Sequence, residues 1–161
     1  MVPADDQFAS KSIFFEDFAL GDVHDLGSYV MEIDEMVGFA LQFDPHPLHV
    51  DEEAGRKSFF GGLVASGVHT LGVYSRLMYD GLMRHVAMAA GRGLDEVRLR
   101  APVRPGDVIS GRARVGAVDD ARRPEQGLVT LECELRNQED TVVLSLSTQI
   151  QVYRRAAAGR V

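Results

Sequence analysis

Cysteine and tryptophan are nearly missing from this chain, which has one Cys and no Trp among its 161 residues. A single cysteine excludes an internal disulfide and is typical of a reducing compartment. No uninterrupted apolar run reaches the roughly 18 residues that a membrane-spanning helix needs. The first residues carry neither the basic nor the apolar region of a secretory signal. We therefore expect a cytoplasmic protein that has no membrane partner.

The one cysteine, Cys133, lies between Glu132 and Glu134 in a stretch that alternates apolar and polar residues. Alternation with a period of two is typical of a half-buried strand. Carboxylates on either side disfavour the thiolate, which is the form in which cysteine attacks. We therefore expect Cys133 to be a core residue of a sheet and not a nucleophile.

Basic residues are fewer than acidic residues in this chain. The chain has 17 Lys and Arg against 24 Asp and Glu, a net charge of −7, which argues against nucleic acid as a partner. Residues 1–53 hold thirteen acidic side chains and one lysine, whereas residues 84–114 hold seven arginines and three acidic residues. An anionic ligand of an acidic protein needs such a local basic area. The alternative is a solvated sheet face that carries arginines, and the sequence does not select one that binds phosphate.

Residue patterns indicate one domain over residues 1–161, with loose ends at about 1–12 and 156–161. Apolar residues at helical spacing predict helices over 35–43, with Asp34 as the N-cap, and over 68–83. Strand-like runs cover 23–33, 96–103, 108–117, 128–136 and 142–153. The last run alternates cleanly, as an antiparallel strand with one buried face does. This order predicts an α+β fold in which an antiparallel sheet surrounds a central helix.

The most informative segment is Asp44-Pro45-His46-Pro47-Leu48-His49, which places a carboxylate and an imidazole five residues apart. On a regular helix that spacing separates two side chains by about 140°, so they would not share a substrate. Pro45 and Pro47 remove backbone donors and favour extended geometry in the preceding residues. We therefore expect an ordered loop that holds Asp44 and His49 around one water, as general acid–base catalysis requires. The alternative is that both residues only cap and brace the loop.

Small residues follow in Gly61-Gly62-Leu63-Val64-Ala65-Ser66-Gly67, which leads into the second helix. N–H groups in the first turn of a helix have no intrahelical acceptor and attract anions. They are therefore suited to receive a developing oxyanion. His46, His49 and Asp51 are conceivable metal ligands, but their spacing does not match a common zinc site. We expect no metal here.

Two runs carry a family resemblance: Phe43-Asp44-Pro45-His46-Pro47-Leu48-His49-Val50-Asp51 and Ser58-Phe59-Phe60-Gly61-Gly62-Leu63-Val64-Ala65-Ser66-Gly67. They resemble the MaoC-like dehydratases, which include the (R)-specific enoyl-CoA hydratases and whose pattern reads roughly Asp-x-Asn-Pro-x-His before a small-residue segment ending in glycine. Further on, Ala101-Pro102-Val103-Arg104-Pro105-Gly106-Asp107 is similar to the strand–turn–strand of that family. The resemblance covers residues 14–154, and His46 stands where the hydratases usually have Asn.

The resemblance implies a hot-dog fold and an enoyl-CoA hydratase, or a 3-hydroxyacyl-CoA dehydratase in the reverse direction. It implies that Asp44 takes a proton from the attacking water, that His49 orients this water, and that the backbone N–H of Gly67 receives the thioester oxyanion. It further implies three substrate-binding residues: Ser66, Ser75 and His46. No cofactor is implied beyond the coenzyme A of the acyl-CoA substrate, and the expected assembly is a homodimer or a larger homo-oligomer.

Two other functions share this fold. An acyl-CoA thioesterase also uses a carboxylate, a water and an oxyanion donor, but directs the water to the thioester carbonyl. A non-catalytic acyl-binding subunit would usually lack the Asp or the His, and this chain has both Asp44 and His49. Acyl chain length, branching and the choice between coenzyme A and a carrier protein are not readable from residue spacing.

Overall fold

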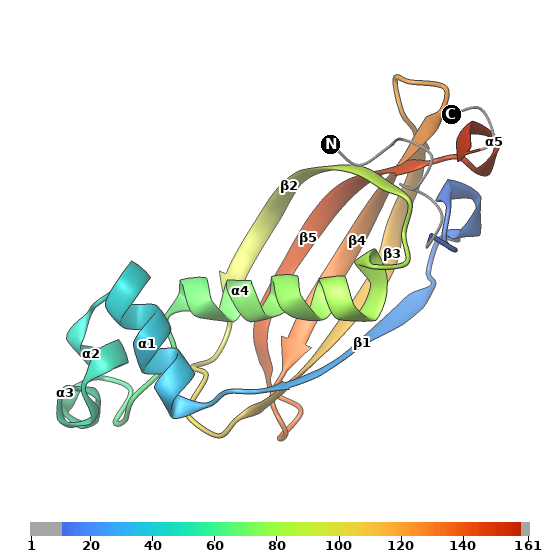
Figure 1. The fold of residues 1–161 in the computed structure, drawn as a ribbon. Coiled ribbons are helices and arrows are strands. Elements are labelled where there is room, and N and C mark those ends of the chain that lie inside the picture. The colour runs from blue at the N-terminus through green and yellow to red at the C-terminus, as the bar shows by residue number, and fades with distance from the viewer. Residues whose placement is uncertain (1–10, 159–161) are drawn as a thin grey trace.

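A five-stranded antiparallel sheet curls around one helix in the computed structural model, which describes residues 11–158 (Figure 1). The strands are β1 (Val23–Val30), β2 (Met88–Leu99), β3 (Val108–Asp120), β4 (Gln126–Arg136) and β5 (Val142–Tyr153), in the spatial order β1-β3-β4-β5-β2. The helices are α1 (Ile33–Phe43), α2 (Pro47–Val50), α3 (Glu52–Lys57), α4 (Gly67–Met78) and α5 (Arg155–Ala158). A 3-10 turn at Phe15–Asp17 (η2) and a π-helical turn at Tyr79–Met83 (η3) complete the fold. This arrangement confirms the predicted α+β class.

β5 lies inside the sheet, between β4 and β2. Its alternation buries Leu146, Ile150 and Val152 in the core. Burying a side chain of this size contributes about 1.5–3 kcal/mol, and a slip of one residue would turn all of them toward solvent. The buried face therefore fixes the register of β5, which has the bounds that its alternation predicts.

α4 runs across the concave side of the sheet and packs Val73, Tyr74 and Leu77 against it. Beneath it on β4 lies Cys133, whose Sγ is 3.8 Å from the Tyr74 hydroxyl. Burial raises the pKa of the Cys133 thiol to about 11. The prediction of a core cysteine is confirmed, although burial and not the adjacent carboxylates is the main cause of its raised pKa.

The predicted helix over 68–83 divides into α4 and the π-helical turn η3. Close packing accompanies this change, because a Cβ atom added to Gly81 would lie only 2.5 Å from the Cα atom of Leu26 in β1. Only glycine fits at such a close approach of two backbones. The position of the helix was thus predictable, whereas the widened last turn depends on a contact with a distant strand.

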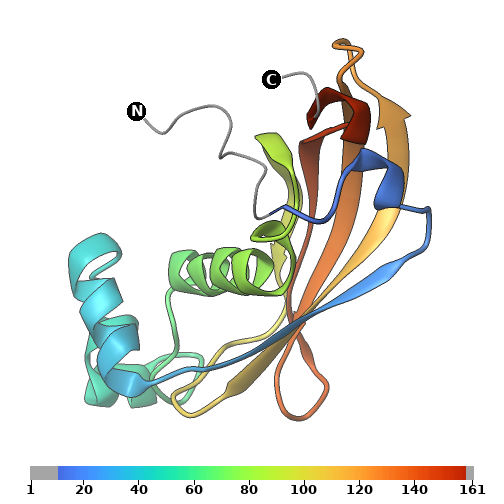
Figure 2. The ribbon, with the colours of Figure 1, turned by 45° about the vertical axis from the view of Figure 1, so that its right-hand side comes forward.

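Three helices, α1 to α3, form an overhang at the N-terminal end of α4 (Figure 2). α1 begins two residues earlier than predicted, with Glu32 and not Asp34 as its N-cap. The segment predicted as a loop over 44–51 includes the helical turn α2, and α3 follows it with Asp51 as N-cap: the N–H of Ala54 donates to Asp51 Oδ1 at 2.7 Å. Both elements are too short to give a periodic pattern.

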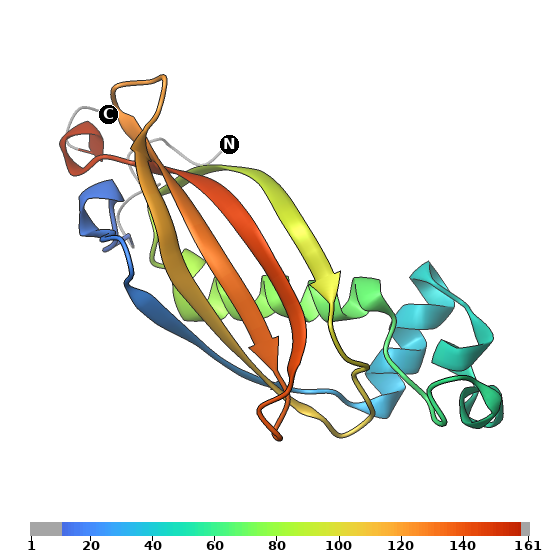
Figure 3. The same ribbon diagram turned by 180° about the vertical axis from the view of Figure 1, so that it is seen from behind.

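β2 is an edge strand, and both of its faces are largely exposed. Figure 3 shows it at one side of the sheet, seen from behind. The prediction of a strand over 96–103 was wrong at both ends, because β2 begins at Met88 and ends at Leu99. Gly91 and Gly93 lie in its first half, where the register with β5 shifts. Without a buried face and with two glycines, this half gives no period-two signal.

The expected loose ends fall partly outside the described residues, which exclude 1–10 and 159–161. Within the described part, the Ser12 N–H donates to the His85 carbonyl at 3.0 Å, and Ile13 pairs with Val86. At the other end, α5 covers Arg155–Ala158. None of the helices between residues 11 and 158 combines the length and the apolar character needed to cross a membrane.

Candidate active site

Asp44 and His49 come from two adjoining elements of the overhang. Asp44 ends α1, and its N–H donates to the Ala40 carbonyl at 2.9 Å. His46 is extended, with φ −69° and ψ 138°, because it precedes Pro47, the first residue of α2. The chain turns between the two helices and returns His49 toward Asp44, so that His49 Nε2 lies 3.6 Å from Asp44 Oδ2.

The ring of His49 has a defined tautomer. Its Nδ1 lies 2.8 Å from the carbonyl oxygen of Val64. A carbonyl oxygen only accepts, so Nδ1 carries the proton and the neutral ring presents Nε2 as an acceptor. Nε2 and the Asp44 carboxylate therefore face each other as two acceptors. A molecule with two donor hydrogens, such as water, can satisfy both.

Ser66 connects the carboxylate to the central helix. Its hydroxyl donates to Asp44 Oδ2 at 2.7 Å and accepts from the N–H of Val68 at 3.2 Å, which makes Ser66 the N-cap of α4. The side chain is fully buried. One hydroxyl therefore fixes both the orientation of the Asp44 carboxylate and the start of α4. Ser66 lies behind Asp44 and is not part of the pocket lining, although sequence reasoning predicted it as a substrate-binding residue.

Gly67 is the first residue of α4, where the N–H groups point away from the helix and attract negative charge. The Leu99 side chain lies directly over it, and a Cβ atom at this position would overlap the Leu99 Cδ1 methyl. A side chain here would require Leu99 to move, and the N–H of Gly67 lies in the first turn of the helix.

Asp44, His49 and Gly67 line the same pocket, which has a volume of about 810 Å³. One wall comes from the overhang and the start of α4, and the other from residues 97–103, which comprise the end of β2 and the segment after it. Most of the remaining lining is apolar: Leu48, Phe59, Phe60, Val64, Ala65, Val68, Leu71, Val97, Leu99, Ala101, Pro102 and Val103. The pocket thus combines a polar end with walls suited to a hydrocarbon chain.

The other two predicted substrate-binding residues lie in different places. His46 lines the pocket, and its ring centroid is 6.1 Å from that of His49. Ser75 is exposed on α4, donates to the Leu71 carbonyl at 3.3 Å and is not part of the pocket lining. Gly72 and Ser75 lie on an exposed face of α4.

Sequence reasoning missed two features of the site. Phe59 is 98% exposed and Leu99 is 60% exposed, although both line the pocket. No pattern identifies them, because single apolar residues in turns have no periodicity. Their position makes the rim of the pocket apolar on both sides.

A second connection ties α1 to α4 one turn away from Ser66. His69 is buried on α4, its Nε2 lies 3.2 Å from Glu35 Oε1, and its ring stacks on Phe39 with 4.6 Å between centroids. Tyr29 donates to the same carboxylate at 2.7 Å, and this hydrogen bond raises the pKa of Tyr29. The sequence indicated only that His69 lies near the start of the helix, because its partner is 34 residues away.

Among residues 11–158, no group of three or more His, Cys, Asp and Glu side chains is arranged to hold a metal ion. His46, His49 and Asp51 do not converge, since the Asp51 carboxylate caps α3 instead. The polar chemistry of the described site therefore comes from Asp44, His49, Ser66 and the backbone at Gly67.

Known proteins resemble this chain over most of its length. The model of the MaoC like domain matches residues 19–137. A crystal structure of the MaoC-like dehydratase from Rhodospirillum rubrum is 38% identical, with a TM-score of 0.82 over 89% of this chain and 99% of that one. The 3-hydroxybutyryl-CoA dehydratase of Methylorubrum extorquens is 29% identical over 149 residues, which are 92% of this chain and 89% of the relative.

A solved (R)-hydratase from A. caviae has 20% identity and a TM-score of 0.70, over 85% of this chain and 98% of that one. At this identity the likeness shows the fold alone. A sheet wrapped around a helix in this way is the hot-dog fold, as the resemblance of the motifs implied. With the family model covering most of the chain, the conclusion is direct: this protein belongs to the MaoC-like domain family.

Proposed function

We propose that this protein adds water across the double bond of a trans-2-enoyl-CoA, or removes water from a 3-hydroxyacyl-CoA in the reverse direction. The observation that carries the proposal is the pair of facing acceptors, Asp44 Oδ2 and His49 Nε2, which lie 3.6 Å apart beside an apolar pocket. Because the tautomer of His49 is fixed, its Nε2 and the Asp44 carboxylate are suited to bind and activate one water. The function named for the Methylorubrum extorquens relative supports the same reaction class.

The reaction follows from the roles of three groups. Asp44 accepts a proton from the water as its oxygen bonds to C3, and His49 keeps that water oriented. The electron pair of the double bond moves toward C1, so negative charge develops on the thioester oxygen. The N–H of Gly67 is suited to stabilise this charge. A proton delivered from the same site to C2 completes the addition, and no covalent intermediate with the protein is needed.

The test is to offer the protein a short trans-2-enoyl-CoA and to follow two signals together. We expect the absorbance of the conjugated double bond to fall without release of free thiol, and the product to be the (R)-3-hydroxyacyl-CoA on a chiral column. A preorganised site selects between C3 and the carbonyl carbon, because these carbons lie two bonds apart and the water is held in one place.

The same measurement separates the competing functions. Free coenzyme A appearing at the rate of substrate loss would identify a thioesterase and contradict the proposal. Absence of turnover with short, long and branched enoyl thioesters, combined with tight binding of those thioesters, would identify an acyl-binding protein. Formation of the (S)-3-hydroxyacyl-CoA would agree with the proposed reaction but contradict the expected stereochemistry.

A further inference from the structure

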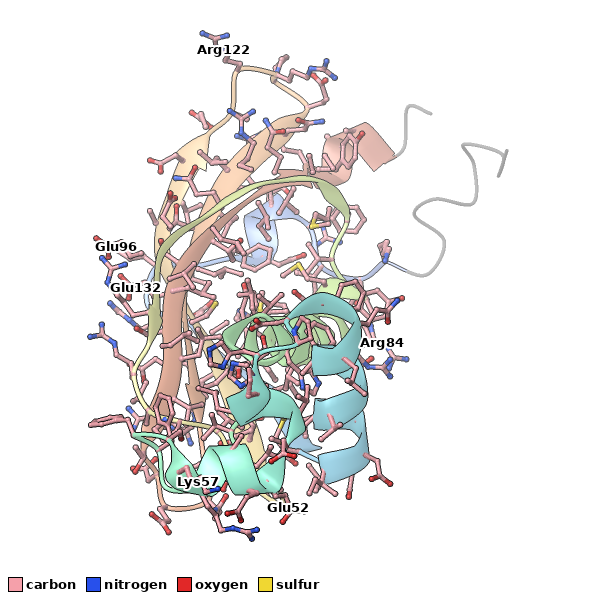
Figure 4. All side chains as sticks on the ribbon, turned by 90° about the vertical axis from the view of Figure 1, so that its left-hand side faces the viewer. Glu52, Lys57, Arg84, Glu96, Arg122 and Glu132 are labelled. Atoms are coloured by element: carbon pink, nitrogen blue, oxygen red, sulfur yellow. The ribbon has the colours of Figure 1, made fainter. Side chains whose placement is uncertain are left out.

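A second cavity lies on the opposite side of the sheet from α4. It has a volume of about 880 Å³, and its lining includes Arg98, Arg100, Arg112, Arg114, Ser145 and Ser147. Figure 4 shows Glu96 and Glu132, which also line it, on the side of the sheet that faces away from α4. We call this cavity the outer groove. Neither the proposed reaction nor the family resemblance uses it.

The strand register aligns the polar residues of the outer groove in a row. Arg112 of β3 pairs with Glu134 of β4, Glu134 pairs with Ser145 of β5, and Ser145 pairs with Arg98 of β2. Three strand spacings of about 4.8 Å separate the two arginines, a span of roughly 14 Å. The two guanidinium groups thus stand at the ends of the row, with the Glu134 carboxylate and the Ser145 hydroxyl between them. Separated guanidinium groups suit an extended ligand with separated anionic groups.

The carboxylates of the outer groove are mostly engaged already. Glu132 pairs with Arg114 at 3.3 Å, and Glu134 pairs with Arg136 at 2.8 Å. By contrast, within residues 11–158 no carboxylate lies within ion-pair distance of Arg98, Arg100 or Arg112. Three arginines against the single remaining carboxylate, Glu96, leave the outer groove with a positive excess on a protein whose net charge is −7.

The outer groove and the candidate active site have one lining residue in common. Arg100 lines both cavities. It follows Leu99, which covers Gly67, and its Nε donates to Ser145 Oγ at 3.0 Å on the outer side of the sheet. A ligand that leaves the active-site pocket past Leu99 therefore meets the Arg100 guanidinium before any other cation of the outer groove.

We propose that the outer groove binds the phosphate-bearing nucleotide arm of a coenzyme A thioester whose acyl end occupies the active-site pocket. This inference rests on the proposed function. Arg100, Arg98 and Arg112 bind the phosphate groups, and Ser145 donates to them from the middle of the row. Arginine suits phosphate because its planar donors match two phosphate oxygens at once.

The proposal is tested with two substrates that carry the same enoyl group. One is the coenzyme A thioester, and the other is the N-acetylcysteamine thioester, which has no phosphate. For Arg98→Gln and for Arg112→Gln, which line the outer groove but not the active-site pocket, we expect KM for the coenzyme A thioester to rise about tenfold, with kcat nearly unchanged, since one charge-assisted contact is lost. KM for the N-acetylcysteamine thioester stays as in the wild type.

Arg122→Gln is the control, because it removes the same charge at an exposed position that lines neither cavity. Figure 4 shows Arg122 at the opposite end of the molecule from Glu52 and Lys57. It leaves both KM values unchanged. Equal changes for the two thioesters in the groove variants would show a distortion of the pocket and overturn the proposal. If the groove variants leave KM for the coenzyme A thioester unchanged, the proposal is overturned as well. The same holds if these variants raise KM only for a thioester of an acyl carrier protein.

A direct binding experiment keeps this inference separate from the proposed reaction. Desulfo-coenzyme A has the nucleotide arm but no thioester, and its binding can be measured by calorimetry whether or not the protein hydrates enoyl groups. We expect binding to the wild type and to Arg122→Gln, about tenfold weaker binding to Arg100→Gln, and a decrease with added salt. Equal affinity in all three proteins would overturn the assignment of the outer groove.

Discussion

Asp44 and Ser66 are separated by 22 residues, yet one hydrogen bond of 2.7 Å joins them. This bond orients the carboxylate, while the carbonyl of Val64 orients the ring of His49. The two groups that face each other are thus each held by a partner from the segment before α4. Residue spacing predicted Asp44 and His49 as a pair, but it did not predict these partners, because a turn of unknown shape separates them in the chain.

Replacing either member of the pair tests its proposed role. For Asp44→Asn and for His49→Ala we expect kcat to fall by at least about 100-fold, the range of a lost general acid or base. Both side chains are partly exposed, at 39% and 15%, so thermal unfolding should change little. Enone absorbance and a melting curve measure the two effects. We expect the companion variant His46→Asn to retain activity, because the hydratases usually have Asn at this position. If Asp44→Asn or His49→Ala keeps near-full activity, or unfolds, the catalytic assignment of that residue is contradicted.

Ser66→Ala separates orientation of the carboxylate from capping of the helix. Loss of the N-cap costs about 0.5–2 kcal/mol of stability, and loss of the bond to Asp44 lowers kcat about tenfold with little change in KM. The matched control is Asp51→Ala, which also removes an N-cap but has no contact with Asp44. We expect similar decreases in unfolding free energy for both variants, measured by urea titration, and a lower kcat only for Ser66→Ala. Equal kcat values would show that Ser66 only caps α4.

At the scale of elements, α4 and the end of β2 meet at Gly67 and Leu99. In Gly67→Ala the new methyl group and the Leu99 side chain occupy the same space, so Leu99 must move into the pocket or α4 must shift. Because Leu99 is 60% exposed and can move aside, we expect little change in stability and a loss of turnover as its side chain enters the pocket. Adding Leu99→Ala removes the overlap and restores part of the activity.

Gly72→Ala is the control for this pair of variants, since no atom lies within 4 Å of a Cβ atom there and alanine favours a helix. Stability of Gly72→Ala should be unchanged or higher, as a chemical denaturation curve will show. If the double variant Gly67→Ala/Leu99→Ala is no more active than Gly67→Ala alone, the loss of turnover comes from the backbone of residue 67 and not from crowding by Leu99.

The elements differ in how far sequence predicts them, for physical reasons. β5 has the predicted bounds because one face is buried along its length. β2 was displaced, because an exposed edge strand has no buried face to impose alternation. Of the apolar residues at helical spacing in α1, Met36 and Ala40 are buried, whereas the side chain of Phe43 is 61% exposed. α1 contacts the rest of the molecule along a narrower face than its apolar residues suggest.

At the scale of the whole molecule, β2 leaves one edge of the sheet without a neighbouring strand. Leu94 is 43% exposed on this strand, and Leu99 at its end is 60% exposed. Strand edges with exposed apolar residues tend to pair with another chain. The candidate pocket includes residues from this end of β2. A second copy that covers the edge of β2 would therefore also approach the pocket.

We predict that the protein is at least a homodimer in solution. Light scattering at micromolar concentration should give at least twice the chain mass of 17.7 kDa. Leu94→Lys places a charge on the exposed edge and should shift the distribution toward monomer, whereas Leu20→Lys changes an equally apolar side chain that is 72% exposed away from β2 and should not. A wild-type mass near 17.7 kDa would contradict the prediction.

The two walls of the active-site pocket come from separate stretches of the chain. The proposed acid–base groups and the oxyanion donor fall within residues 44–67, whereas the facing wall comes from residues 97–103. Substitutions in the second stretch can reshape the space for an acyl chain without moving a catalytic atom. Selection can therefore act on substrate choice and on chemistry almost independently, which is a route by which one scaffold acquires many substrates while its reaction stays the same.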